Sequence, residues 1–129
     1  MPSPVFFLIA ALILSIAPVN SASAGDAIVR GGGTLQLGSV TYRLDGIDAP
    51  PVDQSCIDEH ADVWACGTEA RDQLARLIGD RQVRCDDLGA DPVFKKRRIG
   101  VCKIEGDPTN LSRLVVRNGF ALNVEASAS

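Results

Sequence analysis

YRLDGIDAP, at residues 42–50, joins a regular strand pattern to an abrupt stop. Residues 40–45 alternate apolar and polar side chains, and a period of two is typical of a half-buried strand. This alternation places Arg43 on the polar face of the strand. The two prolines that follow, Pro50 and Pro51, end the pairing because they cannot donate ladder hydrogen bonds. We therefore expect a strand and then a loop that carries Asp48.

A second informative segment, KKRRIGVC at residues 95–102, begins with a basic run and continues as a strand. Residues 81–86 also have strand character, and the loop between the two segments is long enough to turn the chain back. Antiparallel pairing would then place Cys85 opposite Cys102 on one face of a sheet. The basic run would lie at the tip of this hairpin, where charge runs are usually solvated.

The remaining patterns complete a chain of short strands and two helices. The expected elements are strands at 27–30, 34–37, 40–45, 81–86, 98–104 and 120–124, helices at 69–78 and 111–117, and a loop at 88–96. Thr68 and Asn110 are the expected helix N-caps, and Gly79 ends the first helix. This order suits an α+β, mainly β fold: a five-stranded barrel of the OB type with two short helices packed at its openings.

The first 24 residues have the pattern of a signal peptide. VFFLIAALILSIA, at residues 5–17, is an apolar core too short for a bilayer that needs about 20 helical residues. Small residues at 22–24 then match a cleavage site, although an uncleaved anchor is the alternative. We expect one domain at residues 25–124, a frayed tail at 125–129, and a periplasmic or secreted protein that leaves the membrane once the leader is removed.

The charge balance argues against a general polyanion-binding surface. Thirteen Lys and Arg against 16 Asp and Glu give a formal net charge of −3, whereas attraction to phosphate chains needs clustered cations. Contact with nucleic acid must therefore be local, and residues 95–98 (KKRR) are the obvious candidate.

Four cysteines, Cys56, Cys66, Cys85 and Cys102, lie after the leader. An even number in a small exported domain indicates disulfides, with three possible pairings. The strand pattern favours Cys56–Cys66 with Cys85–Cys102, and each bond would contribute about 3 kcal/mol. A zinc site built from His60 with the first two cysteines is the weaker alternative, since it lacks a fourth ligand.

Three segments in this order resemble the staphylococcal nuclease (thermonuclease) family. They are YRLDGIDAP at 42–50, CGTEARDQLARLI at 66–78 and VRNGFAL at 116–122, and the resemblance covers residues 27–122. It implies the OB-type barrel and an active site that cleaves phosphodiester bonds with calcium. In that family, two strand-borne carboxylates hold calcium, a glutamate helps to activate water, and two arginines contact the phosphate.

The resemblance assigns roles to three residues of this chain. Arg43 and Arg97 take the places of the two catalytic arginines, and Asp48 takes the place of a calcium aspartate. Arg43 and Arg97, with Lys95 and Lys96 beside them, would hold a phosphate through paired donors.

Three other positions depart from the family pattern. Gly33 stands where a calcium carboxylate is expected, Pro51 where the glutamate is expected, and Lys95 where a tyrosine flanks the base. Asp53 and Glu59 are candidates to reach back, although both lie on an irregular segment and nothing in the sequence places them in the site. One remaining aspartate implies weak calcium binding at most, because affinity follows the number of charged ligands.

These observations predict an exported domain with weak or lost nuclease activity, a pseudoenzyme that binds a phosphate-bearing or other anionic ligand such as single-stranded nucleic acid or a nucleotide. Two alternatives remain open. One is an active metal-dependent phosphodiesterase or endonuclease that uses Asp48 and a further acid. The other is a structural accessory protein of the cell envelope or of exopolysaccharide production.

Overall fold

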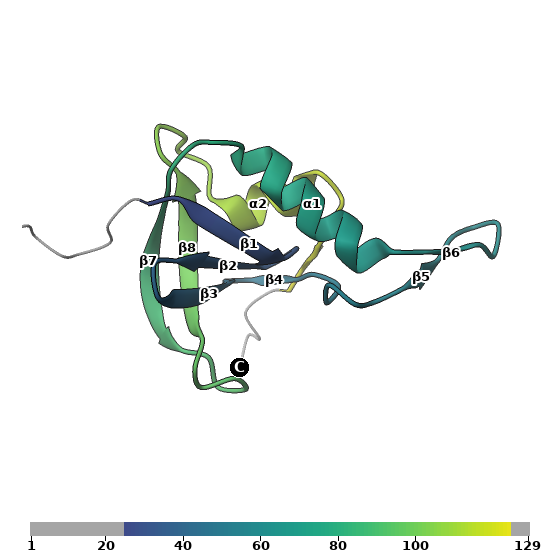
Figure 1. The fold of residues 1–129 in the computed structure, drawn as a ribbon, viewed down its shortest axis with the longest axis horizontal. Coiled ribbons are helices and arrows are strands. Elements are labelled where there is room, and N and C mark those ends of the chain that lie inside the picture. Colours follow the sequence, from purple (N-terminus) through teal and green to yellow (C-terminus); the bar gives the residue numbers. More distant parts are fainter. Residues whose placement is uncertain (1–24, 125–129) are drawn as a thin grey trace, which may run out of the picture.

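The computed structural model describes residues 25–124, so the predicted leader and tail lie outside the described residues. A five-stranded sheet carries two helices and two small ladders (Figure 1). The sheet strands are β1 (Ala27–Gly31), β2 (Thr34–Leu37), β3 (Val40–Leu44), β8 (Arg98–Ile104) and β7 (Val83–Ala90), in that spatial order. The helices are α1 (Cys66–Ile78) and α2 (Leu111–Arg117). The small ladders pair β4 (Ile47–Asp48) with β9 (Leu122–Asn123), and β5 (Cys56–Ile57) with β6 (Val63–Trp64). The predicted α+β class, mostly sheet with two short helices, is confirmed.

One parallel contact decides which residues meet. β1, β2 and β3 form an antiparallel meander and β7 pairs antiparallel with β8, but β3 and β8 run parallel. Their register sets Tyr42 opposite Arg98 and Arg43 opposite Ile99. Tyr42 and Arg43 of β3 therefore lie beside the start of β8, where the basic run at residues 95–98 ends.

The two edges of the sheet approach each other at a single point. Gly25, just before β1, forms a bridge with Val83 of β7 through two backbone hydrogen bonds of 3.0 and 2.9 Å. No longer ladder joins β1 and β7 within the described residues, so the sheet is not closed into a barrel. The OB-type barrel stays a prediction.

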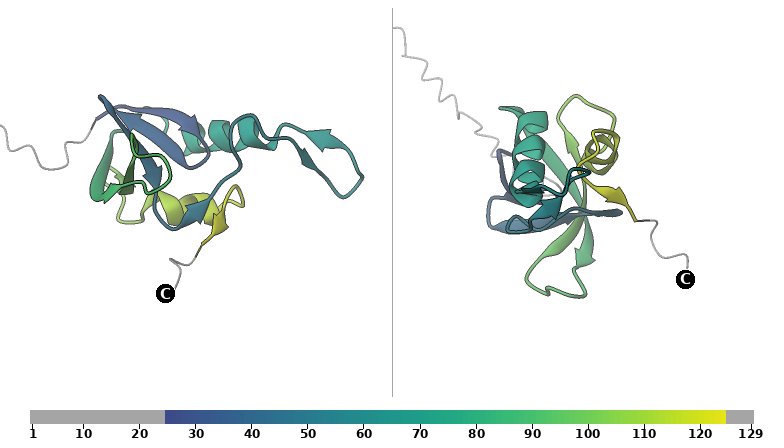
Figure 2. Two further views of the ribbon diagram at one scale, coloured as in Figure 1. Left: turned by 90° about the horizontal axis from the view of Figure 1, so that it is seen from below. Right: turned by 90° about the vertical axis from the view of Figure 1, so that its right-hand side faces the viewer.

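The core lies between the sheet and the two helices (Figure 2). Ala70, Leu74 and Ile78 are buried four residues apart on α1, the spacing of one helical face. Leu111 and Val115 do the same on α2. The buried sheet residues that meet them are Leu35, Leu44, Val83, Cys85, Cys102 and Ile104. Among residues 25–124, no helix has the length and apolar composition needed to cross a membrane.

α1 begins earlier than predicted. It starts at Cys66, its N-cap is Ala65 without a side-chain cap, and the predicted cap Thr68 lies inside the first turn. The Thr68 hydroxyl donates instead to the carbonyl of Val52 at 3.3 Å. A disulfide and the preceding loop hold the first turn in place of a capping side chain. The α2 prediction is confirmed, since Asn110 accepts a hydrogen bond from the Arg113 amide at 2.8 Å.

The hairpin and the loops differ from the sequence prediction in three places. β7 continues to Ala90 through an irregularity near Gly89, so the connecting loop spans only residues 91–97 rather than 88–96. Asp48 was expected in a loop, but strand pairing resumes after Gly46: Ile47 and Asp48 pair with Asn123 and Leu122 of β9. Residues 51–66, where no strand was expected, contain the β5–β6 hairpin, which projects from the body of the domain (Figure 1).

Both disulfides of the favoured pairing are present. Cys85 and Cys102 are directly opposite on β7 and β8, with Cα atoms 4.0 Å apart. Cys56 and Cys66 join β5 to the start of α1, with Cα atoms 5.6 Å apart. The first bond lies in the core and the second at its edge, because Cys56 is only half-buried.

Candidate phosphate-binding site

A cavity of about 460 Å³ opens where the β1–β2 turn, β3, β4 and the loop 91–97 meet. It is lined by Arg30, Gly31, Gly32, Gly33, Thr34, Arg43, Ile47, Asp48, Ala49, Pro50, Pro51, Val52, Phe94 and Arg97. The structure thus brings Arg97 beside Arg43 and Asp48, which lie in a much earlier segment of the chain. Gly33 and Pro51 lie in the same wall. We call this space the arginine cavity.

Arg43 reaches the arginine cavity from the middle of the sheet. Its strand lies between β2 and β8, with Thr34 and Ile99 as its paired neighbours, so the backbone at this point is held on both sides. The residue is half-buried. It has no ion pair or side-chain hydrogen bond within the described part of the chain, so its guanidinium is available to an anion.

Arg97 enters the same cavity but is held by a partner. Its Nη2 and Nε donate to one carboxylate oxygen of Asp91 at 2.8 and 3.2 Å, and its guanidinium lies over the Phe94 ring, 4.3 Å from the centroid. Only 26% of the Arg97 side chain is exposed, and only 2% of Asp91. Paired hydrogen bonds and ring stacking fix the plane of the guanidinium, which prepares its remaining donors for a ligand.

Asp91 is one of two residues at this site that sequence reasoning missed. Its second oxygen accepts hydrogen bonds from the backbone amides of Val93 at 2.9 Å and Phe94 at 3.4 Å. The Val93 amide, and then the Arg97 side chain, hold the pKa of Asp91 below its ordinary value despite burial. An aspartate directly before Pro92 is a recognisable turn former, but only the fold shows that it also orients the arginine.

The basic run at residues 95–98 is divided by the fold. Lys95 and Lys96 are exposed and do not line the arginine cavity. Arg98 turns to the sheet, where its Nε and Nη2 donate to Asp87 at 2.9 Å each, and this pairing lowers the pKa of Asp87. Of these four residues, Arg97 is therefore the one that lines the cavity. The two lysines lie on the same loop, 91–97, but outside the cavity lining.

Arg30, at the end of β1, is a third cation that the sequence did not single out. It lines the arginine cavity, and its guanidinium donates to the Gln36 side chain at 2.8 and 3.1 Å. Three consecutive glycines next to Arg30 would permit a turn with unusual backbone angles. However, positive φ values occur elsewhere and not at Gly31, Gly32 or Gly33. Gly32 instead allows close packing, since a Cβ there would lie 2.7 Å from that of Ala70 on α1.

The donors in this cavity do not fit a calcium centre. Asp48 is the sole carboxylate among the lining residues, and it is exposed. Asp53 and Glu59 do not line the cavity, and Glu59 instead lies 3.7 Å from His60. Nowhere in residues 25–124 do three or more His, Cys, Asp or Glu side chains gather as a metal site would require. The zinc alternative also lacks support, because Cys56 and Cys66 are joined to each other.

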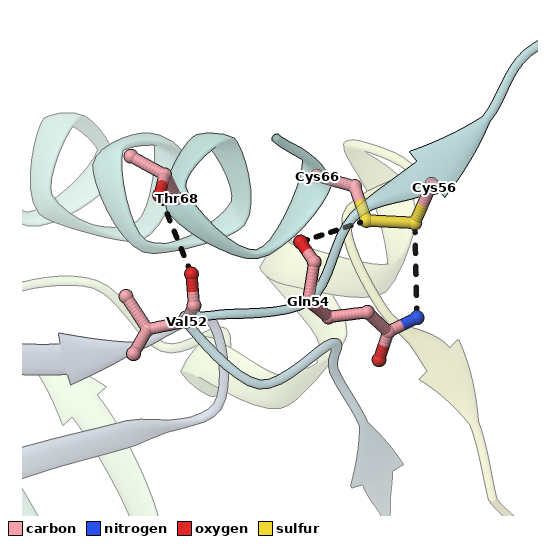
Figure 3. The surroundings of a disulfide bond; sticks show 5 residues. All are labelled: Val52, Gln54, Cys56, Cys66 and Thr68. Atoms are coloured by element: carbon pink, nitrogen blue, oxygen red, sulfur yellow. Dashed lines mark hydrogen bonds between the residues drawn. A yellow bond between two sulfur atoms is a disulfide. The ribbon is translucent and has the colours of Figure 1, made fainter. Parts of the chain in front are cut away.

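The segment that carries Pro51 is fastened to α1 (Figure 3). The Gly67 amide donates to the Gln54 carbonyl at 3.1 Å, and the Gln54 amide donates to the Pro51 carbonyl at 2.8 Å. A Cβ at Gly67 would lie 1.8 Å from the Pro51 carbonyl oxygen, so only glycine permits this approach. With the Cys56–Cys66 bond and the Thr68 hydroxyl, these contacts fix one wall of the arginine cavity.

Comparison with known proteins found one informative relative. The succinoglycan biosynthesis protein ExoI of Rhizobium meliloti (strain 1021) is 31% identical over 100 residues, which are 77% of this chain and 51% of that protein. The chain therefore spans about half the length of this relative. No family model matches the chain.

Proposed function

We propose that this protein is an exported, thermonuclease-like domain that binds a phosphate-bearing ligand, single-stranded nucleic acid or a nucleotide, with little or no hydrolysis. The observation that carries the proposal is that Arg43 and Arg97 line one cavity with a single carboxylate, Asp48. The strand order and the Gly25–Val83 bridge support an OB-type arrangement, in which strands 1 and 4 of the five approach each other. The two disulfides suit a periplasmic or extracellular protein.

Phosphate binding follows from how the two arginines are held. Arg97 is already oriented by Asp91, so little side-chain entropy is lost when its remaining donors meet an oxygen. Arg43 lies on a central strand and brings a second planar fork. Two guanidinium groups on one anion give charge-assisted hydrogen bonds, which are about twice as strong as neutral ones.

Cleavage is a weaker expectation than binding. Attack on a phosphodiester needs a group that takes a proton from water, and such a base contributes about 10²–10⁴ in rate. Pro51, at the position that the thermonuclease resemblance gives to this base, has no proton acceptor in its side chain. Arg43 and Arg97 would still hold the phosphate, but holding alone does not activate water.

The test is to incubate the oxidised protein with single-stranded DNA and RNA, with and without calcium, and to measure binding and cleavage separately. We expect salt-sensitive binding that Arg43→Ala and Arg97→Ala each weaken, and no calcium-dependent cleavage. Arg117→Ala is the matched control, since it removes an exposed arginine outside the cavity. Calcium-dependent cleavage that Asp48→Ala abolishes would overturn the proposal in favour of an active nuclease.

A constructive test restores the two missing acids. Gly33→Asp with Pro51→Glu should raise calcium affinity and produce cleavage if the alignment is right. The new Cβ at position 33 would lie 3.3 Å from that of Ala49, so a small local shift accommodates it. Continued inactivity with unchanged calcium affinity would show that other parts of the site differ as well.

A second candidate function is an accessory role in exopolysaccharide production. The observation that favours it is the similarity to a protein named for succinoglycan biosynthesis. In that case, deletion of the gene should lower exopolysaccharide yield, and a chain carrying Arg43→Ala with Arg97→Ala should restore it. If only the unaltered chain restores the exopolysaccharide yield, the role in exopolysaccharide production requires the arginine cavity.

A further inference from the structure

A second hollow lies on the other side of the segment 48–51. It has a volume of about 320 Å³ and is mostly apolar. Its lining residues are Asp48, Ala49, Pro50, Pro51, Gln54, Cys56, Trp64, Cys66, Ala70, Gly119, Phe120, Ala121 and Leu122. We call it the Trp64 groove. Asp48, Ala49, Pro50 and Pro51 line both the groove and the arginine cavity, so the two spaces share one wall.

The groove combines an aromatic surface with few polar groups. Trp64 is 42% exposed and Leu122 is 72% exposed, so both present apolar surface to a ligand in the groove. Gln54 and Asp48 supply hydrogen-bonding groups at the edge. An apolar surface with a few polar groups at its rim is the usual form of a site for a flat ring.

Charge distinguishes the groove from its neighbour. The arginine cavity is lined by three arginines, whereas the groove has no cation among its lining residues and one carboxylate, Asp48. A phosphate is therefore favoured in the first space and disfavoured in the second. A ligand that occupies both must place its charge on Arg43 and Arg97 and an uncharged part in the groove.

We infer that the Trp64 groove is a subsite for a second base, that of the nucleotide next to the one whose phosphate is held in the arginine cavity. This inference rests on the proposed function and narrows the ligand to an oligonucleotide of at least two units. The indole of Trp64 would stack on the base, a contact that tolerates any base because every base has a π-face. Gln54 and Asp48 would meet its polar edge.

The groove is built to hold its shape. β9 forms one side through its pairing with β4, where Leu122 is opposite Asp48. Trp64 forms another side, because β6 sets it opposite Cys56, which is bonded to Cys66 at the start of α1. The Cys56–Cys66 bond therefore positions both the indole and the wall that the two spaces share.

The experiment uses Trp64 itself, since it is the single tryptophan of the chain. The oxidised protein is titrated with thymidine monophosphate, with the 5′-phosphorylated dinucleotide pTpT, and with a dinucleotide of equal charge whose second unit lacks a base. Intrinsic fluorescence reports the groove, and calorimetry gives the affinities. We expect pTpT to quench the fluorescence and to bind about tenfold more tightly than the abasic form, the scale of one stacked base.

Variants separate the two spaces. Trp64→Ala should remove the advantage of pTpT over the abasic form, Trp64→Phe should keep most of it, and both should leave thymidine monophosphate affinity within about twofold. Arg97→Ala should weaken all three ligands. If Trp64→Ala does not fold, as judged by circular dichroism, the comparison of pTpT with the abasic form in the unaltered protein decides.

Three results would overturn the inference. Equal affinities of pTpT and the abasic form, with thymidine monophosphate still dependent on Arg97, would refute the subsite and leave phosphate binding intact. Quenching by a neutral oligosaccharide at lower concentration than by pTpT would assign the groove to sugars. Failure of all three nucleotides to bind would refute the proposed function itself.

Discussion

The contact between Asp91 and Arg97 yields the sharpest prediction, and Asp91→Asn is the perturbation that isolates it. An asparagine keeps an oxygen for the Val93 and Phe94 amides, which now donate to Asp91 at 2.9 and 3.4 Å. It replaces the oxygen that faces Arg97 with an amide nitrogen, which cannot accept a hydrogen bond. The loop should therefore keep its turn while the arginine loses its partner.

The size of the effect follows from burial. Arg97 donates twice to an oxygen of a carboxylate that is 2% exposed. Hydrogen bonds to charged groups contribute about 1.5–3 kcal/mol, and the partial exposure of Arg97 places the expected loss at the lower end, about 1–2 kcal/mol in the free energy of unfolding. Phosphate affinity should fall about three- to tenfold, because Arg97 keeps its charge but loses its fixed orientation.

Urea denaturation of the oxidised protein measures the stability loss, and calorimetry with thymidine monophosphate measures the affinity. Asp87→Asn is the matched control: it removes the same type of pair, with Arg98, from the same hairpin, but both side chains there are well exposed. The control should change stability less and leave affinity unaltered. A loss for Asp91→Asn no larger than that of the control would refute the assigned role of Asp91.

Four further predictions follow from the structure. Gly67→Ala should destabilise the protein by about 1–3 kcal/mol through overpacking against the loop before α1, although the same change stabilises an ordinary helix; a raised thermal midpoint would contradict this. Replacing Cys85 and Cys102 together by alanine should cost about 3 kcal/mol in urea denaturation, and a loss below about 1 kcal/mol would show that the bond adds little. The pKa of Asp91 is lowered in the folded state, so its carboxylate stabilises the protein at pH values above the ordinary aspartate pKa of about 3.9. This contribution declines as the pH falls below that value. The difference in the free energy of unfolding between the unaltered protein and Asp91→Asn should therefore be constant above about pH 5 and should narrow below about pH 4. Asp48→Asn should tighten phosphate binding about two- to fivefold in the presence of a chelator, since it removes a negative charge from the cavity wall; weaker binding would show that the carboxylate assists the ligand.

Sequence patterns predicted the elements whose side chains repeat regularly. The alternation in β3 and the helical spacing in α2 were sufficient to predict a strand and a helix at these positions. Asn110 was recognisable as a cap from its chemistry alone. The pairing of Cys85 with Cys102 followed from the hairpin, once both strands were recognised.

The missed features depend on contacts between distant segments. α1 could begin at Cys66 only because Gly67 packs against the Pro51 carbonyl, which no local pattern records. β4, β5 and β6 have two residues each, too few for a period to be visible. Trp64 lies in a polar stretch without periodicity. Its position depends on its strand partner Cys56, which is bonded to Cys66 at the start of α1.

The candidate site was predicted in part for the same reason. Arg43, Asp48 and Arg97 were chosen through a family resemblance, and the parallel pairing of β3 with β8 explains why Arg97 shares a cavity with the distant Arg43. Asp91 and Arg30 were not chosen. Neither stands at a position that the resemblance marks, and their roles appear only when the loop 91–97 and the β1–β2 turn are placed together.

Gly33 and Pro51 stand where the thermonuclease resemblance would place carboxylates, and their side chains change the charge that the cavity favours. With acids at positions 33 and 51, the wall would carry three carboxylates against Arg30, Arg43 and Arg97, and a divalent cation would be needed before a phosphate could enter. With Gly33 and Pro51, Asp48 alone opposes the three arginines. Since opposite charges in a partly enclosed space attract more strongly than in open water, we expect a phosphate to enter the cavity without a metal. The same two replacements that argue against hydrolysis therefore argue for binding.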